Sequence, residues 1–207
     1  EKSKFAWVFE KLASIMYPYH TSATSQIQLL RARRKSFTKL RQEILAPLNK
    51  RIDTVQVKMA DKDGRWSEIN FNHVTSRTLR KHPLAWQNLT KTDQTRYEKA
   101  DRTACATNYA QHLENATRKD SGAKVHGKRC ATYELVKDAL RSKSETDTKR
   151  IDLQWEDNAS QNQALGNFIA MVDTSSSMET DDCLPLYNAL GIGIRIAEKA
   201  ESPFTNR

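Results

Sequence analysis

The stretch that most constrains the fold is a short apolar run that ends in an aspartate. Residues 168–172 read Phe-Ile-Ala-Met-Val, and Asp173 follows at once. A run of this length, rich in Phe, Ile and Val, is typical of a buried strand. Polar residues then continue to Cys183, and a helical apolar pattern begins at Leu184 and continues to Ala197. Strand, polar loop and helix in this order predict the opening unit of a doubly wound α/β domain, where ligands bind beyond the strand's carboxyl end.

The loop after this predicted strand carries oxygen donors at regular spacing. Asp173, Ser175 and Ser177 form the pattern Asp-x-Ser-x-Ser, which resembles the metal-ion-dependent adhesion site of von Willebrand A domains. Mg2+ prefers oxygen ligands at about 2.0–2.1 Å in octahedral geometry, and two hydroxyls two residues apart in an extended loop point the same way. The alternative is a Ser-rich turn in which Asp173 forms a turn or caps the following helix.

The resemblance implies that Asp173, Ser175 and Ser177 are Mg2+ ligands, with Asp173 bound through water. It also implies that a threonine and an aspartate from later loops complete the site. The sequence stops at Arg207, before either of these, so the site is expected to be incomplete in this chain.

Charge is distributed unevenly along the chain. Lys and Arg outnumber Asp and Glu by 12 to 4 in residues 1–60 and by 19 to 12 in residues 61–150, whereas residues 151–207 hold 3 against 9. A basic body suits a polyanion and an acidic end suits a cation. The three cysteines are far apart, which argues against a disulfide framework. No apolar run is long enough for a membrane span and no signal peptide is visible, so an intracellular, non-secreted protein is expected.

Helical periodicity dominates the first 150 residues. It predicts helices over 2–17, 25–45, 75–82 and 93–118, another that begins near Pro47, and one from Thr132 to Leu140. The helix over 93–118 is expected to begin with a capping box at Thr95 and Glu98. The buried face of the helix over 25–45 is expected to consist of Ile27, Leu30, Phe37, Leu40 and Ile44. The polar residues 142–150 are expected to be a linker.

Several landmarks occur in order along the chain. They are Trp7 in the segment 4–18, the basic helix 31–45, the Trp66–Phe71 cluster, residues 133–136, Trp155, and the loop 173–178. In this order the chain resembles a family of uncharacterised proteins from giant DNA viruses, phages, fungi and plants, in which a helical-repeat region precedes a von Willebrand A domain. That architecture is similar to the Ro autoantigen and its relatives, which bind small structured RNAs and single-stranded RNA ends.

The resemblance implies a fold that is mainly α, followed by the first strand and helix of a truncated α/β, Rossmann-like domain. Residues 1–150 are then a basic helical domain of the TROVE type, and residues 151–207 are the amino-terminal part of a von Willebrand A domain. RNA is the implied partner. The implied compartment is the cytoplasm, the nucleus or a virion, without a membrane.

Basic side chains that could contact an RNA backbone gather at three places. The first cluster lies on the helix over 25–45, the second precedes Trp86, and the third lies in the loop 119–130, where Gly122 and Gly127 favour mobility. Each cluster is alternatively a solvated surface, and Trp86 is more often a core residue than a base-stacking one. The candidate residues are Arg31, Arg33, Arg34, Lys35, Lys39 and Arg41, then Arg77, Arg80 and Lys81, then Lys128 and Arg129.

Three functions are compatible with these features. The first is a non-enzymatic, Ro-like ribonucleoprotein component whose A-type domain holds Mg2+ and recruits a carboxylate from an acidic protein partner. The second is a protein-interaction or structural module of a virion or ribonucleoprotein, without RNA specificity. The third is a metal-dependent hydrolase, which lacks an identifiable general base.

Overall fold

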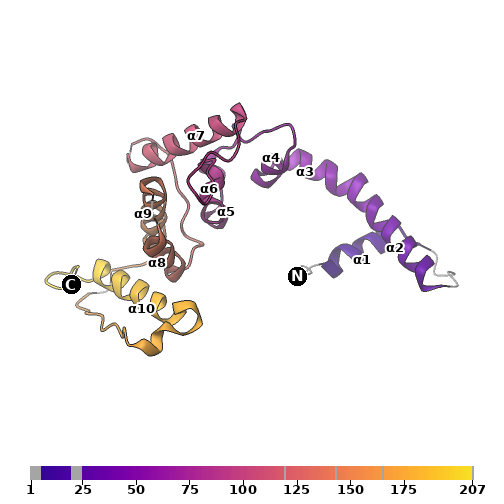
Figure 1. The fold of residues 1–207 in the computed structure, drawn as a ribbon. Coiled ribbons are helices and arrows are strands. Elements are labelled where there is room, and N and C mark those ends of the chain that lie inside the picture. Colours follow the sequence, from indigo (N-terminus) through magenta and orange to yellow (C-terminus); the bar gives the residue numbers. More distant parts are fainter. Residues whose placement is uncertain (1–5, 20–24, 119, 143, 165, 207) are drawn as a thin grey trace. The chain divides into compact units, whose positions relative to one another are not determined.

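The computed structural model describes residues 6–19, 25–118, 120–142, 144–164 and 166–206. Over these residues the chain consists of helices joined by loops, as Figure 1 shows. The chain divides into two compact units, which we call unit 1 (Glu1–Asp63) and unit 2 (Gly64–Arg207). The mainly helical body that the sequence predicts agrees with this architecture.

Unit 1 is a run of helices that begins with a hairpin. Its elements are α1 (Ala6–Met16), α2 (Gln26–Leu40), the π-helical turn η1 (Arg41–Leu45), α3 (Ala46–Ile52) and α4 (Val55–Ala60). Ser25 caps α2 by accepting a hydrogen bond from the backbone N–H of Gln28. Pro47 lies in the first turn of α3, which continues directly from η1, so its missing N–H removes one hydrogen bond from this helical run. Asp53 ends α3 in the left-handed conformation, with φ of 47°.

The contact between α1 and α2 is small. The hydroxyl of Ser36 donates to the carbonyl of Ala13 at 2.7 Å and lies 2.8 Å from that of Tyr17. Leu40 is buried, as predicted, but Ile27 and Leu30 are more than 60% exposed. The predicted buried face of α2 is therefore largely wrong. Helical spacing places these side chains on one face, but within unit 1 the hairpin covers only part of that face.

Unit 2 contains the larger core. Its elements are η2 (Phe71–His73), α5 (Ser76–Lys81), α6 (Pro83–Trp86), α7 (Ala100–Thr117), α8 (Thr132–Arg141), α9 (Glu145–Ala159), η3 (Ser176–Glu179) and α10 (Thr180–Lys199). Phe71 joins two other rings of this core, because its centroid lies 5.5 Å from Trp86 and 5.1 Å from Tyr109. The prediction that Trp86 is a core residue is confirmed, since none of it is exposed.

Two boundaries in unit 2 differ from the prediction. Residues 93–99 precede α7 instead of forming its first turns, because Asp93 has φ of 57° in a turn closed by a bridge between Leu89 and Thr95. The predicted capping box at Thr95 is therefore wrong. Most of the predicted linker 142–150 is helix α9, whose first turn is capped by Ser144 through the N–H of Asp147.

The predicted strand at residues 168–173 is contradicted. Among the described residues no strand or sheet forms, and the segment runs extended between an isolated bridge at Gly166 and the turn η3. Phe168 is 60% exposed and Met171 is 98% exposed. An apolar run becomes a strand only when a neighbouring strand takes its backbone hydrogen bonds, and the described chain supplies none. The α/β, Rossmann-like part of the predicted fold is therefore corrected to an extended segment followed by a helix.

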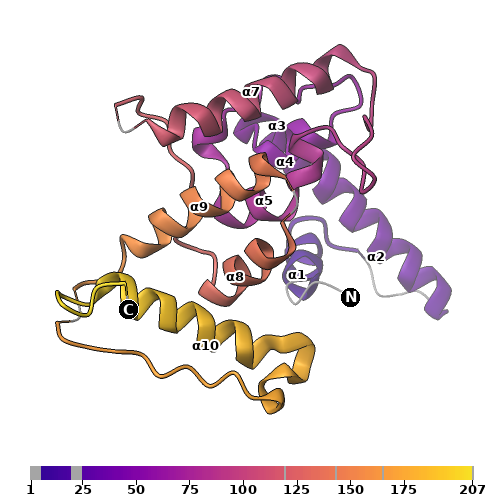
Figure 2. The ribbon, with the colours of Figure 1, turned by 60° about the vertical axis from the view of Figure 1, so that its left-hand side comes forward.

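The predicted helix beyond Leu184 is present as α10, which packs against α8 in Figure 2. Its start differs from a regular helix because Asp181, Asp182 and Cys183 all have positive φ. Gly191 allows the close approach to α8, since a Cβ at this position would lie 3.1 Å from the Cβ of Thr132. The guanidinium of Arg195 stacks over the ring of Trp155 at 3.9 Å, which fixes α10 to α9.

Candidate nucleic-acid interface

The first predicted cluster lies on a continuous helical surface in unit 1. Ser36 and Leu40 face α1, and the cations occupy the remaining surface of α2 and the start of η1. All of these cations are exposed, and most of them have no acidic partner among the described residues. We call this unpaired set the basic face of α2, and it consists of Arg31, Arg34, Lys35, Lys39 and Arg41.

Arg33 differs from its neighbours. Its guanidinium forms an ion pair with Glu10 of α1. Both side chains are about half exposed, so this pair stabilises the hairpin only weakly. Arg33 is therefore turned toward α1, and the structure separates it from the basic face of α2.

The second predicted cluster does not act as one surface. Arg80 lies between α5 and α8, where its guanidinium donates to Asp138 at 2.7 Å and to Glu134 at 2.9 Å. These hydrogen bonds consume its donors inside unit 2. Arg77 and Lys81, on the same helix, remain exposed. Only these two of the three candidates are therefore available to a ligand.

The third cluster, Lys128 and Arg129, has exposed side chains on an anchored backbone. The carboxylate of Asp157 accepts hydrogen bonds from the N–H groups of Gly127 at 2.7 Å and Lys128 at 3.1 Å. A Cβ on Gly127 would lie 1.9 Å from the carbonyl oxygen of Gln154. Gly127 therefore serves close packing against α9, whereas the sequence had suggested loop mobility.

The residues of the predicted metal motif lie together on an exposed loop of unit 2. The N–H of Ser175 donates to Oδ1 of Asp173 at 2.9 Å, and the hydroxyls of Ser175 and Ser177 are 2.9 Å apart. Two hydrogen bonds from Ser175 lower the pKa of the Asp173 carboxyl. The bond from the backbone N–H has the larger effect, and the bond from the side chain has the smaller one. The carboxylate is therefore charged at neutral pH.

These three residues offer oxygen atoms of the type that Mg2+ prefers, but they are half of an octahedral shell. No group of three or more His, Cys, Asp or Glu side chains suited to a metal occurs in the described ranges. The oxygen donors are of the right type for Mg2+, but they are too few to complete its coordination shell. Mg2+ binding at Asp173, Ser175 and Ser177 therefore stays a prediction.

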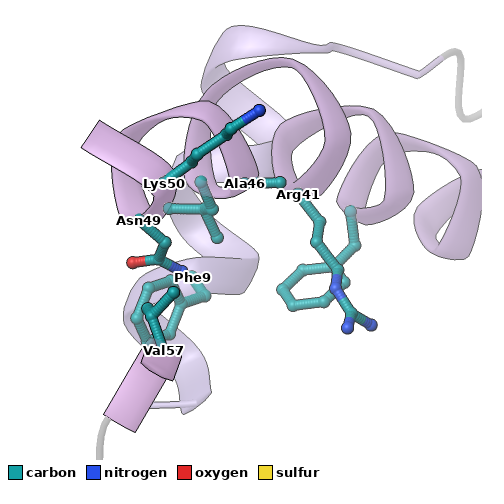
Figure 3. Close-up of a pocket in the computed structure, with 8 residues that line it drawn as sticks. Phe9, Arg41, Ala46, Asn49, Lys50 and Val57 are labelled. Carbon is teal, nitrogen blue, oxygen red and sulfur yellow. The ribbon is translucent and has the colours of Figure 1, made fainter. Parts of the chain in front are cut away.

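One feature of unit 1 is not predicted by the sequence. A groove of about 480 Å3 lies among α1, α2, η1, α3 and α4, and Phe9, Phe37 and Val57 form its apolar surface. Figure 3 shows Phe9 and Val57 in this groove. Arg41, Asn49 and Lys50 add polar groups to its lining. Helical spacing assigns Phe9 and Phe37 to a core, yet they are 40% and 37% exposed. The sequence signal of this groove is two aromatic residues within a basic segment, although their helical spacing predicts packing in a core.

Within the described part of the chain, no helix combines the length and the apolar character that crossing a bilayer requires. Comparisons with protein-family models, with curated proteins and with solved structures found no match.

Proposed function

We propose that unit 1 binds RNA by placing the basic face of α2 against the phosphate backbone. The observation that carries the proposal is that these cations are exposed on one helical surface and have no acidic partner within the described ranges of the chain. Arg31 and Arg41 are ten residues apart, which spans about 15 Å along a helix. A surface of that length with five cations matches a stretch of several phosphates, and each contact releases counterions from the nucleic acid.

The charge balance of the two units supports this choice. Residues 1–63 carry 13 Lys and Arg against 6 Asp and Glu. In unit 2 several cations are compensated locally, as when Asp182 pairs with Lys137 and Arg141. A compensated cation contributes little to the field that attracts a polyanion. The unpaired charge of unit 1 is therefore the better candidate for the contact with RNA.

A second candidate function is a protein-interaction module, and one observation favours it. Unit 1 exposes large apolar side chains, with Trp7, Ile15, Ile27 and Leu30 each more than 60% exposed. Large apolar side chains left exposed to solvent are a feature of protein contact surfaces when they lie close together. A partner bound through such groups keeps its affinity in high salt, whereas RNA bound through phosphates loses affinity.

Two measurements test the proposal. The absorbance ratio of the purified protein at the nucleic-acid and protein maxima reports co-purified nucleic acid, which the proposal expects before a high-salt wash and not after it. A filter-binding titration with a single-stranded RNA at several salt concentrations then measures the salt slope. Affinity that does not change with salt would contradict the proposal and favour the protein-interaction module.

A further inference from the structure

The groove in unit 1 combines features that rarely serve packing alone. The rings of Phe9 and Phe37 line it from two different helices, and both rings keep more than a third of their surface exposed. In Figure 3 the side-chain amide of Asn49 extends toward Phe9 and Val57. This amide has no hydrogen-bond partner among the described residues, and Asn49 is exposed, so its donor and acceptor are open to a ligand.

The turn that shapes this groove is unusual. The N–H of Ala46 donates to the carbonyl of Arg41, five residues earlier, which is the hydrogen bond of a π-helix. The widened turn allows Arg41, Leu45 and Ala46 all to line the groove. Single π-helical turns inside α-helices occur frequently at functional sites.

The charged side chains that line the groove are both cations. Arg41 and Lys50 are exposed cations, and neither forms an ion pair within the described ranges. The carboxylate of Glu43, which accepts a hydrogen bond from the hydroxyl of Tyr17 at 2.8 Å, is not part of the lining. A ligand of this groove should therefore carry negative charge beside a flat apolar part that has a hydrogen-bonding edge.

An unstacked nucleotide has these three properties. Aromatic side chains in basic grooves stack with bases of single strands, and amide side chains bind base edges. We propose that the groove receives one base of single-stranded RNA, with adjacent phosphates on Arg41 and Lys50. An acidic amphipathic peptide would also match the charge and the apolar surface, but the flat faces of two aromatic rings beside cations suit a base better than they suit aliphatic side chains. This inference rests on the proposed function and adds a preference for unpaired RNA.

The test compares a single-stranded RNA with a duplex of the same length at one salt concentration. Replacing both rings, Phe9→Leu with Phe37→Leu, keeps apolar volume and removes the flat faces. Single-strand affinity is then expected to fall about 10-fold, while duplex affinity and the salt slope stay the same. Phe168→Leu, an equally conservative change at an exposed ring of unit 2, is the matched control and should change neither affinity.

Asn49→Ala provides a second variant that does not threaten folding, because Asn49 is exposed in a helix and alanine favours helices. It is expected to weaken single-strand binding several-fold and to spare the duplex. If both variants bind the single strand like the wild type, or lose single strand and duplex equally, the base-binding role is wrong. Competition by an acidic amphipathic peptide, without any single-strand preference in the wild type, would assign the groove to a protein partner.

The two proposals fail differently. If wild-type protein binds single strand and duplex equally, and neutralising the basic face of α2 weakens both, RNA binding holds and the base-binding groove does not. If the wild type shows no salt-dependent binding to either RNA, the proposed function itself is wrong.

Discussion

Neutralising part of the basic face of α2 should reduce the salt dependence of RNA binding by a calculable amount. If each of its five cations neutralises one phosphate of a single strand, log affinity falls with log salt at a slope of about −3.5. Between about 50 and about 200 mM salt the affinity should then fall about 100-fold. Arg31→Gln with Lys35→Gln removes two contacts and should bring the slope to about −2, so that the fall becomes about 20-fold.

The perturbation is specific to the proposed contact. Arg31 and Lys35 lie one turn apart on the same surface, they are exposed, and glutamine preserves helix propensity. Lys91→Gln with Lys99→Gln changes net charge equally at exposed positions of unit 2, and it should leave the slope unchanged. Filter binding across a salt series measures both slopes. If the wild type and the α2 variant have equal salt slopes, the assignment of phosphate contacts to α2 is refuted. The same holds if the α2 variant and the Lys91/Lys99 variant show equal reductions of the salt slope.

Three further predictions concern unit 2. Gly127→Ala should lower the free energy of unfolding by about 3 kcal/mol, measured by denaturant titration, because the added Cβ meets the carbonyl of Gln154. Burial, opposed by a hydrogen bond to the Lys124 carbonyl, lowers the pKa of His112, so unfolding free energy should fall as pH drops below about 6.5. Magnesium titrated into the protein should release or absorb heat in a calorimeter if the motif binds it, and Asp173→Asn should abolish that heat.

Matched controls accompany these predictions. Gly122→Ala meets no atom within 4 Å, so it should cost only the backbone strain of its φ of +69°, about 1 kcal/mol. His112→Gln should flatten the pH dependence below about 6.5, because the folded histidine resists the proton that the unfolded one accepts. Asp152→Asn, an exposed acid distant in sequence from the loop, should leave any magnesium heat intact. An identical response of test and control variants would contradict each explanation.

The helices were largely predictable because helical periodicity is a local signal. The failures concern partners that lie elsewhere in the chain. The run at 168–173 has the composition of a strand, but a strand also needs a neighbour to bond with, and composition does not report one. Ile27 and Leu30 have helical spacing, yet spacing does not say whether a second element covers their face.

The difference between local signals and distant partners also explains which residues of the candidate site could be predicted. Arg31 and Arg80 are equivalent by composition, since both lie in basic clusters on predicted helices. They differ because Arg80 meets Asp138, which is 58 residues away in sequence and 2.7 Å away in the fold. Pairing between distant residues cannot be inferred from one sequence. The groove at Phe9 was missed for the same reason, because its lining comes from elements up to 48 residues apart.

Folding and binding are expected to be coupled in unit 1. Among its described residues only Ala13, Ser36 and Leu40 are buried, so its own packing contributes little stability. A ligand that binds only the folded form adds about 2.7 kcal/mol when present at 100 times its dissociation constant. Single-stranded RNA should therefore protect the amide hydrogens of α2 from exchange far more than those of α7, whose Tyr109 and Leu113 are already buried. Equal protection of the two helices would mean that RNA acts on the whole chain, or on unit 2, and would remove the basis for assigning the contact to α2.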